Sequence, residues 1–256
     1  MSTSTPISSR DNPLVRQWRR LAQDGAAYRD AEQVWLEGDH LIRALLARGT
    51  QPVWLVGTPE GLAMADGWGL APSVRRVSLP TALMGHISGL PSPPTIAAVH
   101  AVSLKAPPVP GLATVVLDRL QDPGNVGSVL RSAAAFGFGQ VLALKGTAAL
   151  WSPKVLRAGM GAHFALRLVE GADAAALPAL GLPLLATSSH AGEWLHQTRL
   201  PWPCAWLLGH EGQGLAAPLM ALAERQVRIV QPGGEESLNV AAAAAICLHA
   251  SAAARS

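Results

Sequence analysis

The chain has 256 residues, of which 49% are hydrophobic and 14% are charged, and its formal net charge is +3. This length and hydrophobic content predict one large folded domain or two modest ones, and they exclude a globally disordered chain. The small positive charge permits binding to nucleic acid but does not establish it.

The cysteines and the apolar segments indicate the compartment. Cys204 and Cys247 are the only cysteines, and neither has a neighbour at a metal-ligand spacing, so we expect two reduced, buried thiols and no zinc site. Residues 1–10 are polar and lack the apolar centre of a signal peptide. The alanine-rich stretch 240–254 is short for a membrane span. These features predict a cytoplasmic protein that makes no membrane contact.

The first part of the chain alternates between helical and strand-like patterns. Helical periodicity covers residues 14–21 and 39–47, and short apolar runs typical of strands occupy 34–36, 53–56 and 96–99. Two proline clusters follow between Gly89 and Gly111, and proline restricts φ and removes a backbone donor. We therefore predict a small α/β domain over residues 1–105 and a second domain over residues 106–256.

The second part of the chain alternates more regularly. Apolar strand-like runs occupy residues 113–117, 141–144, 165–169, 184–187, 205–208 and 227–230. Helical patterns occupy residues 126–136, 153–160, 173–180, 216–225 and 238–254. Continuous apolar strands separated by helices predict a mostly parallel sheet with helices on both faces. The predicted fold class is α/β.

Common nucleotide-binding and hydrolase motifs are missing from the sequence. The chain contains no G-x-G-x-x-G, no G-x-x-x-x-G-K-[ST], no G-x-S-x-G and no H-E-x-x-H. His190, His196 and His210 lie close together in the sequence but lack the spacing of metal ligands. We therefore predict no metal site.

Three polar, glycine-containing loops each lie where a predicted strand ends and a predicted helix begins. They cover residues 117–128, 208–215 and 231–240. In a parallel sheet such loops share the carboxyl edge, which is where ligands bind. Asn125 and Ser237 are placed to cap the helices that follow the first and third loops. Arg131 lies beyond the first turn of its helix, where it is either a functional side chain or a solvated surface residue.

The spelling and order of these loops resemble those of a known family. The first loop reads D-P-G-N-V-G from Asp122 and is followed by Arg131; the second reads G-H-E-G-Q-G from Gly209; the third contains S-L-N-V from Ser237. Over residues 112–254 the chain resembles the SpoU/TrmH family of RNA ribose 2′-O-methyltransferases in the SPOUT superfamily. The resemblance implies a C-terminal domain with a deep trefoil knot, S-adenosylmethionine as cofactor and RNA as substrate.

The resemblance also implies which residues form the site. It gives catalytic roles to Arg131, Asn125, Glu211, Ser237 and Asn239. It places three residues in the cofactor pocket, largely through their backbone groups: Gly209, Ile229 and Leu238. A guanidinium stays protonated in proteins, so we prefer an Arg131 that orients the ribose hydroxyl and stabilises the developing oxyanion over one that abstracts a proton.

Residues 1–105 show a looser resemblance to a substrate-binding extension found in some family members, which is like the ribosomal RNA-binding proteins L30e and L7Ae. The matching features are I-S-S at residues 7–9, N-P-L-V at 12–15 and L-E-G at 36–38. Arg16, Arg19 and Arg20 beside Trp18 predict a patch that contacts RNA phosphates. A solvated helix face is the alternative interpretation of these arginines.

The resemblance further implies a homodimer in which each site borrows residues from the partner. The apolar stretch 240–254 offers surface for this pairing, although burial in the core explains it equally well. The N-terminal extension favours ribosomal RNA over transfer RNA as substrate. The alternatives are a transfer RNA 2′-O-methyltransferase, a knotted enzyme that methylates a base nitrogen, and a non-catalytic RNA-binding module.

Overall fold

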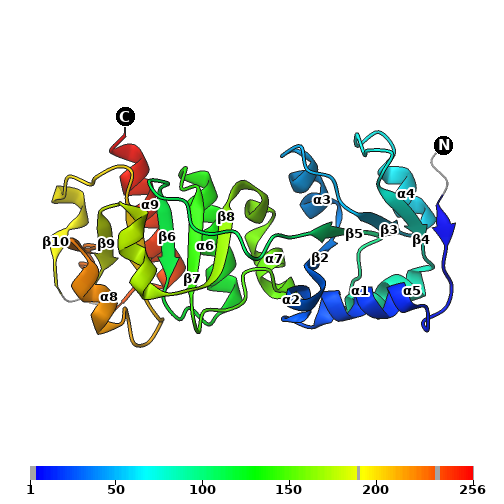
Figure 1. Cartoon of the computed structure of the whole chain (residues 1–256), viewed down its shortest axis with the longest axis horizontal. Helices are drawn as coiled ribbons and strands as arrows, with labels where there is room; N and C mark the ends of the chain where they lie inside the picture. The colour runs from blue at the N-terminus through cyan, green and yellow to red at the C-terminus, as the bar shows by residue number, and fades with distance from the viewer. Residues whose placement is uncertain (1–3, 189–190, 234–236, 256) are drawn as a thin grey trace. The chain divides into compact units, whose positions relative to one another are not determined.

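The computed structural model describes residues 4–188, 191–233 and 237–255. The chain divides into two compact units (Figure 1). The first unit comprises Met1–Leu104 and Trp151–Phe164, and the second comprises Lys105–Leu150 and Ala165–Ser256. A segment from inside the predicted second domain, Trp151–Phe164, therefore packs with the first part of the chain.

The first unit is built on a five-stranded sheet in the order β1-β4-β3-β5-β2. Strand β5 runs antiparallel to both of its neighbours, β2 and β3, and the other pairs are parallel. The strands are β1 (Thr5–Pro6), β2 (Gln33–Glu37), β3 (Trp54–Gly57), β4 (Arg75–Ser78) and β5 (Ile96–Ala101). The helices are α1 (Pro13–Gln23), α2 (Ala27–Ala31), α3 (Asp39–Leu46), α4 (Pro59–Met64), α5 (Thr81–Ser88), α7 (Pro153–Gly159) and most of the 3-10 helix η1 (Ala162–Ala165).

Trp18 lies in the interior of the first unit and not on its surface. Its side chain is 1% exposed, and its ring stacks on Trp35 and meets Trp54 edge-on. The expected RNA-facing patch beside Trp18 is therefore wrong in this detail, because α1 turns its apolar face with Trp18 towards the sheet. Arg16, Arg19 and Arg20 on the other face are exposed.

The segment that contains α7 completes the first unit. Arg157 on α7 pairs with the Glu37 carboxylate at 3.4 Å, and the Glu37 side chain is only 6% exposed. The His40 ring lies 3.3 Å from the backbone oxygen of Met160. Gly161 packs directly against Ala44, so that a Cβ at Gly161 would collide with the Ala44 side chain.

The second unit is built on a seven-stranded sheet in the order β10-β12-β9-β11-β6-β7-β8, and every pair in it is parallel. The strands are β6 (Thr114–Leu117), β7 (Gln140–Leu144), β8 (Arg167–Ala172), β9 (Leu184–Thr187), β10 (Glu193–Trp194), β11 (Ala205–Leu208) and β12 (Arg225–Arg228). The helices are α6 (Pro123–Ala135), α8 (Ala217–Leu222), α9 (Val240–Ala253) and the 3-10 helices η2 (Ala174–Leu180) and η3 (Leu195–Gln197).

Helices cover both faces of this sheet. Successive side chains in its strands point to opposite faces, so neighbouring residues pack against different helices. Val116, Leu142 and Leu207 pack with residues of η2 and α8. On the other face Trp206 donates a 2.8 Å hydrogen bond to the Ser251 hydroxyl of α9, and α6 packs against α9. The prediction of an α/β fold with a mostly parallel sheet is confirmed.

Several element boundaries differ from the sequence-based expectation. Strand β12 begins at Arg225, two residues earlier than expected, and α8 is correspondingly shorter. The segment expected as a helix over residues 173–180 is the 3-10 helix η2, and it contains Pro178, which cannot donate the hydrogen bond of an α-helical turn. Helices α4 and α5 were not anticipated, since each spans only six to eight residues and contains a glycine, Gly61 or Gly85.

The two cysteines and the helix lengths agree with a chain built around buried apolar cores. Cys204 and Cys247 are free thiols, and burial raises their pKa to about 11 and about 12 respectively. Among the helices in the described ranges, none is both long and apolar enough to cross a membrane.

Candidate functional site

The three glycine-containing loops follow strands β6, β11 and β12, all at the carboxyl edge of the seven-stranded sheet. Strands β6 and β11 are neighbours, and only β9 separates β11 from β12. Parallel strands deliver their following loops to the same edge. The first loop leads into α6, the second into α8 and the third into α9 (Figure 1). Part of the third loop, Gly234, Glu235 and Glu236, lies outside the described residues, as does His190.

The first loop is fixed at the start of α6 by Asp122. The Asp122 carboxylate accepts a 2.7 Å hydrogen bond from the backbone N–H of Asn125, and Pro123 occupies the first helical position. The expectation that Asn125 caps this helix is therefore wrong. Asp122 takes the cap because Pro123 needs no hydrogen-bond acceptor, and this leaves the side chain of Asn125 free for other contacts.

Asn125, Glu211 and Asn239 form a hydrogen-bonded chain of side chains that joins the three loops; we call it the amide–carboxylate cluster. The side-chain amide of Asn125 donates to Glu211 at 3.2 Å, and the side-chain amide of Asn239 donates to the Asn125 oxygen at 3.0 Å. Each residue comes from a different loop. Asn125 is thus brought into direct contact with two candidate residues that lie 86 and 114 positions away in the sequence.

Asn239 has a second role as the N-cap of α9. Its side-chain oxygen accepts hydrogen bonds from the backbone N–H groups of Ala241 and Ala242 at 2.9 and 3.3 Å. Ser237 was expected in this position, and that expectation is wrong: α9 begins two residues later than the motif suggested. Ser237 and Leu238 are exposed and precede the cap. The cap orients the Asn239 amide towards Asn125, since its oxygen is held by the helix.

Glu211 is held as a carboxylate by its surroundings. Partial burial acts to raise its pKa, but hydrogen bonds from backbone amides and from the Asn125 side chain outweigh this effect, and the pKa lies below the usual value for a glutamate. One of these donors is the backbone N–H of Asp122, at 3.4 Å. Glu211 therefore accepts from two donors of the first loop and stays charged at neutral pH.

The second loop is folded tightly upon itself. His210 and Gly214 exchange two backbone hydrogen bonds, at 3.0 and 2.8 Å, and the His210 Nδ1 atom accepts from the backbone N–H groups of Gly212 and Gln213. Gly209 is buried, and a Cβ there would collide with the backbone of Gly214 and Leu215. No role was assigned to His210 from the sequence, because a histidine in a variable motif position gives no signal of a ring that caps its own loop.

Asp118 and Arg119 tie the first loop to the second, and the sequence analysis missed both. Arg119 donates to both oxygens of Asp118 at 3.0 Å, to the Gln213 side chain at 3.0 Å and to the Gly214 carbonyl at 3.5 Å. Asp118 also accepts from the backbone N–H of Ala216 at 2.9 Å. The hydrogen bonds with Asp118 raise the pKa of Arg119 above its usual value. We call this set of contacts the Arg119 clasp.

Arg131 is not part of the amide–carboxylate cluster. It lies six residues after Asn125 on α6, which places it about 9 Å further along the helix and about 120° around it. The side chain is exposed and makes no hydrogen bond or ion pair with any residue in the described part of the chain. Its guanidinium therefore faces solvent without a partner among the described residues.

The predicted cofactor residues lie at the same carboxyl edge. Gly209 follows β11 directly, half-buried Ile229 follows β12, and exposed Leu238 precedes α9. Two residues beyond Ile229, the side-chain oxygen of Gln231 is buried and accepts no hydrogen bond from the described residues. A buried acceptor without a donor is uncommon in folded proteins, and a ligand that supplies an N–H or O–H group would satisfy this one.

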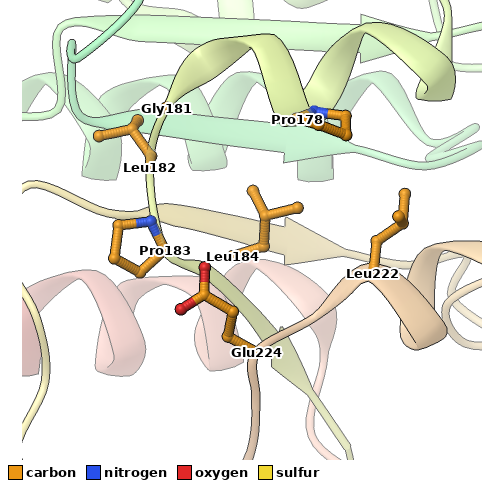
Figure 2. A pocket seen from close by; sticks show the side chains of 7 residues that line it. All are labelled: Pro178, Gly181, Leu182, Pro183, Leu184, Leu222 and Glu224. Atoms are coloured by element: carbon orange, nitrogen blue, oxygen red, sulfur yellow. The ribbon is translucent and has the colours of Figure 1, made fainter.

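A separate cavity of about 400 Å³ lies at the opposite edge of the sheet (Figure 2). It sits where β9 begins and where the chain enters β12, and its only charged lining residue is Glu224. The lining residues are Pro178, Gly181, Leu182, Pro183, Leu184, Leu222 and Glu224. None of the candidate site residues lines this cavity. Within the described ranges, no three His, Cys, Asp or Glu residues are grouped as metal ligands would be.

Comparisons with known proteins agree on one family. The profile of the SpoU rRNA Methylase family matches residues 113–249. An uncharacterized tRNA/rRNA methyltransferase of Synechocystis sp. is 33% identical over 95% of this chain and 92% of its own length. The 23S rRNA (guanosine(2553)-2′-O)-methyltransferase RlmP of Bacillus subtilis is 29% identical over 95% of this chain and 97% of its own. The structure of the AdoMet-bound rRNA methyltransferase from Sinorhizobium meliloti has a TM-score of 0.83 at 25% identity and covers 97% of both chains.

Proposed function

This chain belongs to the SpoU rRNA Methylase family, and we propose on that premise that it transfers a methyl group from S-adenosylmethionine to a ribose 2′-hydroxyl of structured RNA. The observation that carries the proposal is the amide–carboxylate cluster, which joins the three motif loops through Asn125, Glu211 and Asn239. Such a constellation of fixed polar groups at the carboxyl edge of a parallel sheet is suited to holding a ligand in one orientation.

The residues of the second and third loops fit S-adenosylmethionine. The cofactor supplies, when bound, a methyl group on a sulfonium that leaves as a neutral thioether. Gly209 offers backbone groups without a side chain, and Ile229 and Leu238 offer apolar contact to a purine ring. The unpartnered oxygen of Gln231 can accept a hydrogen bond from an amino group, and the cofactor carries two of them.

Arg131 acts on the substrate in this proposal. Its guanidinium is exposed and unpaired in the described part of the chain, so its five N–H donors are available to the ribose oxygen and a neighbouring phosphate. It orients the hydroxyl and stabilises the oxyanion while the hydroxyl proton passes to solvent water. Asn125, Glu211 and Asn239 hold the three loops in register, and Ser237 contacts the substrate from the third loop.

The proposed substrate is ribosomal RNA, acted on in the cytoplasm. Named relatives that methylate ribosomal RNA support this choice over transfer RNA. Residues 1–105 serve as the RNA-binding domain of the L30e/L7Ae type, in which the exposed Arg16, Arg19 and Arg20 of α1 contact phosphates; Arg20 exchanges its ion pair with Asp30 for this contact. The catalytic domain, residues 106–256 without the segment Trp151–Phe164 that packs with the first unit, carries the trefoil knot that the resemblance implies.

The test of this function is methyl transfer to RNA. We expect the purified chain with S-adenosylmethionine to introduce 2′-O-methylnucleosides into unmodified ribosomal RNA, detected by nuclease digestion and mass spectrometry. Methylated bases without ribose methylation would replace the proposal with the base-nitrogen enzyme. RNA binding without transfer would replace it with the binding module. Mapping the 2′-O-methyl groups lost in a deletion strain then separates ribosomal from transfer RNA as the substrate.

We further propose that the active form is a homodimer. Val230, Leu238 and Ile246 are large apolar residues that are 39–44% exposed, and they follow one another along the third loop and α9. Three exposed large apolar side chains within residues 230–246 support an interaction surface on this part of the chain. A partner subunit would also bring groups to Arg131, which is unpaired among the residues that the structure describes.

Replacing Ile246 by glutamate should disrupt this dimer. A charge in an apolar interface is unpaired and desolvated, so we expect the variant to elute as a monomer in light-scattering measurements at micromolar concentration. Methyl transfer should fall with the dimer fraction. Ala242→Glu is a second charged substitution at an exposed position of the same helix. A monomer by light scattering would place Ala242 inside the interface, and a dimer would place it outside. A wild-type monomer with full activity would reject the homodimer.

A further inference from the structure

The Arg119 clasp connects two loops that the proposed function uses, yet Arg119 itself belongs to no assigned site. We propose that Arg119 is a positioning residue for methyl transfer: it holds the second loop in the conformation that the cofactor requires. This inference rests on the proposed function, since it assigns the loop of Gly209 and Glu211 to the cofactor and the site. The experiment below can therefore reject the role of Arg119 without rejecting the proposed methyl transfer.

The backbone at Arg119 is held in an unusual conformation by its own side chain. Its φ is 57°, in the left-handed region that residues with a Cβ rarely adopt. The bidentate pair with Asp118 stabilises this conformation, because both carboxylate oxygens receive guanidinium N–H groups at 3.0 Å. The Asp118 side chain is only 5% exposed, and Asp118 directly follows β6, so the pair is anchored at the end of a buried strand.

The clasp secures the far end of the second loop. At the near end, the backbone N–H of Asp118 donates to the Leu208 carbonyl at 2.8 Å, next to Gly209. At the far end, the guanidinium reaches Gln213 and Gly214, and Asp118 accepts from Ala216. Two consecutive residues of the first loop therefore fix both ends of the second. Without the guanidinium, the contacts to Gln213 and Gly214 are lost.

The position of the clasp predicts an effect on ligand binding more than on folding. The loop residues from Glu211 to Gly214 are exposed, so their order contributes little apolar burial to the unit. A ligand that needs the loop in one conformation must order it upon binding when the clasp is absent. Removing the clasp should therefore weaken cofactor binding and leave the affinity for RNA unchanged.

The test is Arg119→Gly, which removes the guanidinium and at the same time tolerates the left-handed backbone. We expect S-adenosylmethionine to bind about tenfold more weakly in calorimetry, and its KM to rise accordingly, while the KM for RNA changes little. The melting temperature should fall as well, because the nearly buried Asp118 carboxylate loses its cation. Met160→Gly is the matched control, because Met160 also has a positive φ, 48°, and lies outside all three loops. This control should bind the cofactor as the wild type does.

Two further variants separate the clasp from a general structural effect. Arg119→Lys keeps the charge but not the planar fork, so it should restore little of the affinity. Gln213→Ala removes one acceptor of the clasp and should weaken cofactor binding by about threefold without altering folding, which keeps the test valid if Arg119→Gly fails to fold. Wild-type cofactor affinity in Arg119→Gly would overturn the role of Arg119 and leave the proposed function standing. If Arg119→Gly does not fold, wild-type cofactor affinity in Gln213→Ala would have the same meaning. Absence of cofactor binding by the wild type would overturn the proposed function and the inference together.

Discussion

Replacing Arg131 by alanine is expected to lower the rate constant of methyl transfer by roughly two orders of magnitude or more. The affinity for S-adenosylmethionine should stay almost unchanged. The structure supports this separation, because Arg131 is exposed and makes no hydrogen bond or ion pair with the described residues of the second and third loops. Its removal should also leave the melting temperature unchanged, as is usual for a surface residue without partners.

The measurement is single-turnover methylation at saturating RNA and cofactor, with a calorimetric cofactor titration beside it. Arg131→Lys distinguishes positive charge from geometry, since lysine lacks the planar fork that orients an oxygen. We expect lysine to restore little of the rate. Arg29→Ala is a suitable control, because Arg29 is an exposed helical arginine of α2 that the proposed function does not use. A wild-type rate in the alanine variant would return Arg131 to the class of solvated surface residues.

Replacing Asn125 by aspartate is expected to reduce methyl transfer by about a hundredfold at neutral pH, because it puts two carboxylates in contact within the amide–carboxylate cluster. The wild-type amide donates to Glu211 and accepts from Asn239, and aspartate can only accept. Repulsion between the two carboxylates should separate the first loop from the second. Glu211→Gln in the same background removes that repulsion and should recover part of the rate.

The same cluster has a defined pH dependence. The pKa of Glu211 is lowered in the folded chain, so its contribution to stability is complete above the unfolded value, about 4.3, and is lost as the pH falls through the lower folded value. Wild-type activity should therefore show no loss from Glu211 between pH 5 and pH 8, an interval above both values. In Asn125→Asp, the new carboxylate and that of Glu211 should share one proton, which they bind at a higher pH than Glu211 does alone. The activity of this variant should therefore rise on mild acidification. An identical pH–rate profile for the two proteins would contradict this account of the cluster.

The sequence allowed the sheet and the edge that carries the loops to be predicted, and the reason is visible in the strands. Val115, Val116 and Leu117 form an uninterrupted apolar run because both faces of β6 are buried. The same holds for Ala205–Leu208 in β11. Short elements with mixed patterns, such as α4 and β4, carry no comparable signal because tertiary packing determines them.

The contacts inside the site were predictable only in part. Motif spelling identified Asn125, Glu211 and Asn239, but their direct hydrogen bonds depend on sheet order, which the sequence does not state. Both helix caps were misassigned by two or three residues, because Asp122 and Asn239 compete with nearby polar residues that are equally good caps. Arg119 was missed because its role arises from a φ of 57° that no motif specifies.

The packing of Trp151–Phe164 with the first unit also has a consequence for synthesis on the ribosome. The chain emerges from its N-terminus, so residues up to Leu104 are made well before the segment that carries Arg157. Until then the nearly buried Glu37 carboxylate lacks its arginine partner, and Ala44 lacks the glycine that covers it. Strands β6 and β7 are already synthesised by that time. The N-terminal unit therefore completes its fold only after translation of the second unit is well under way, and the two cannot mature as independent, sequential domains.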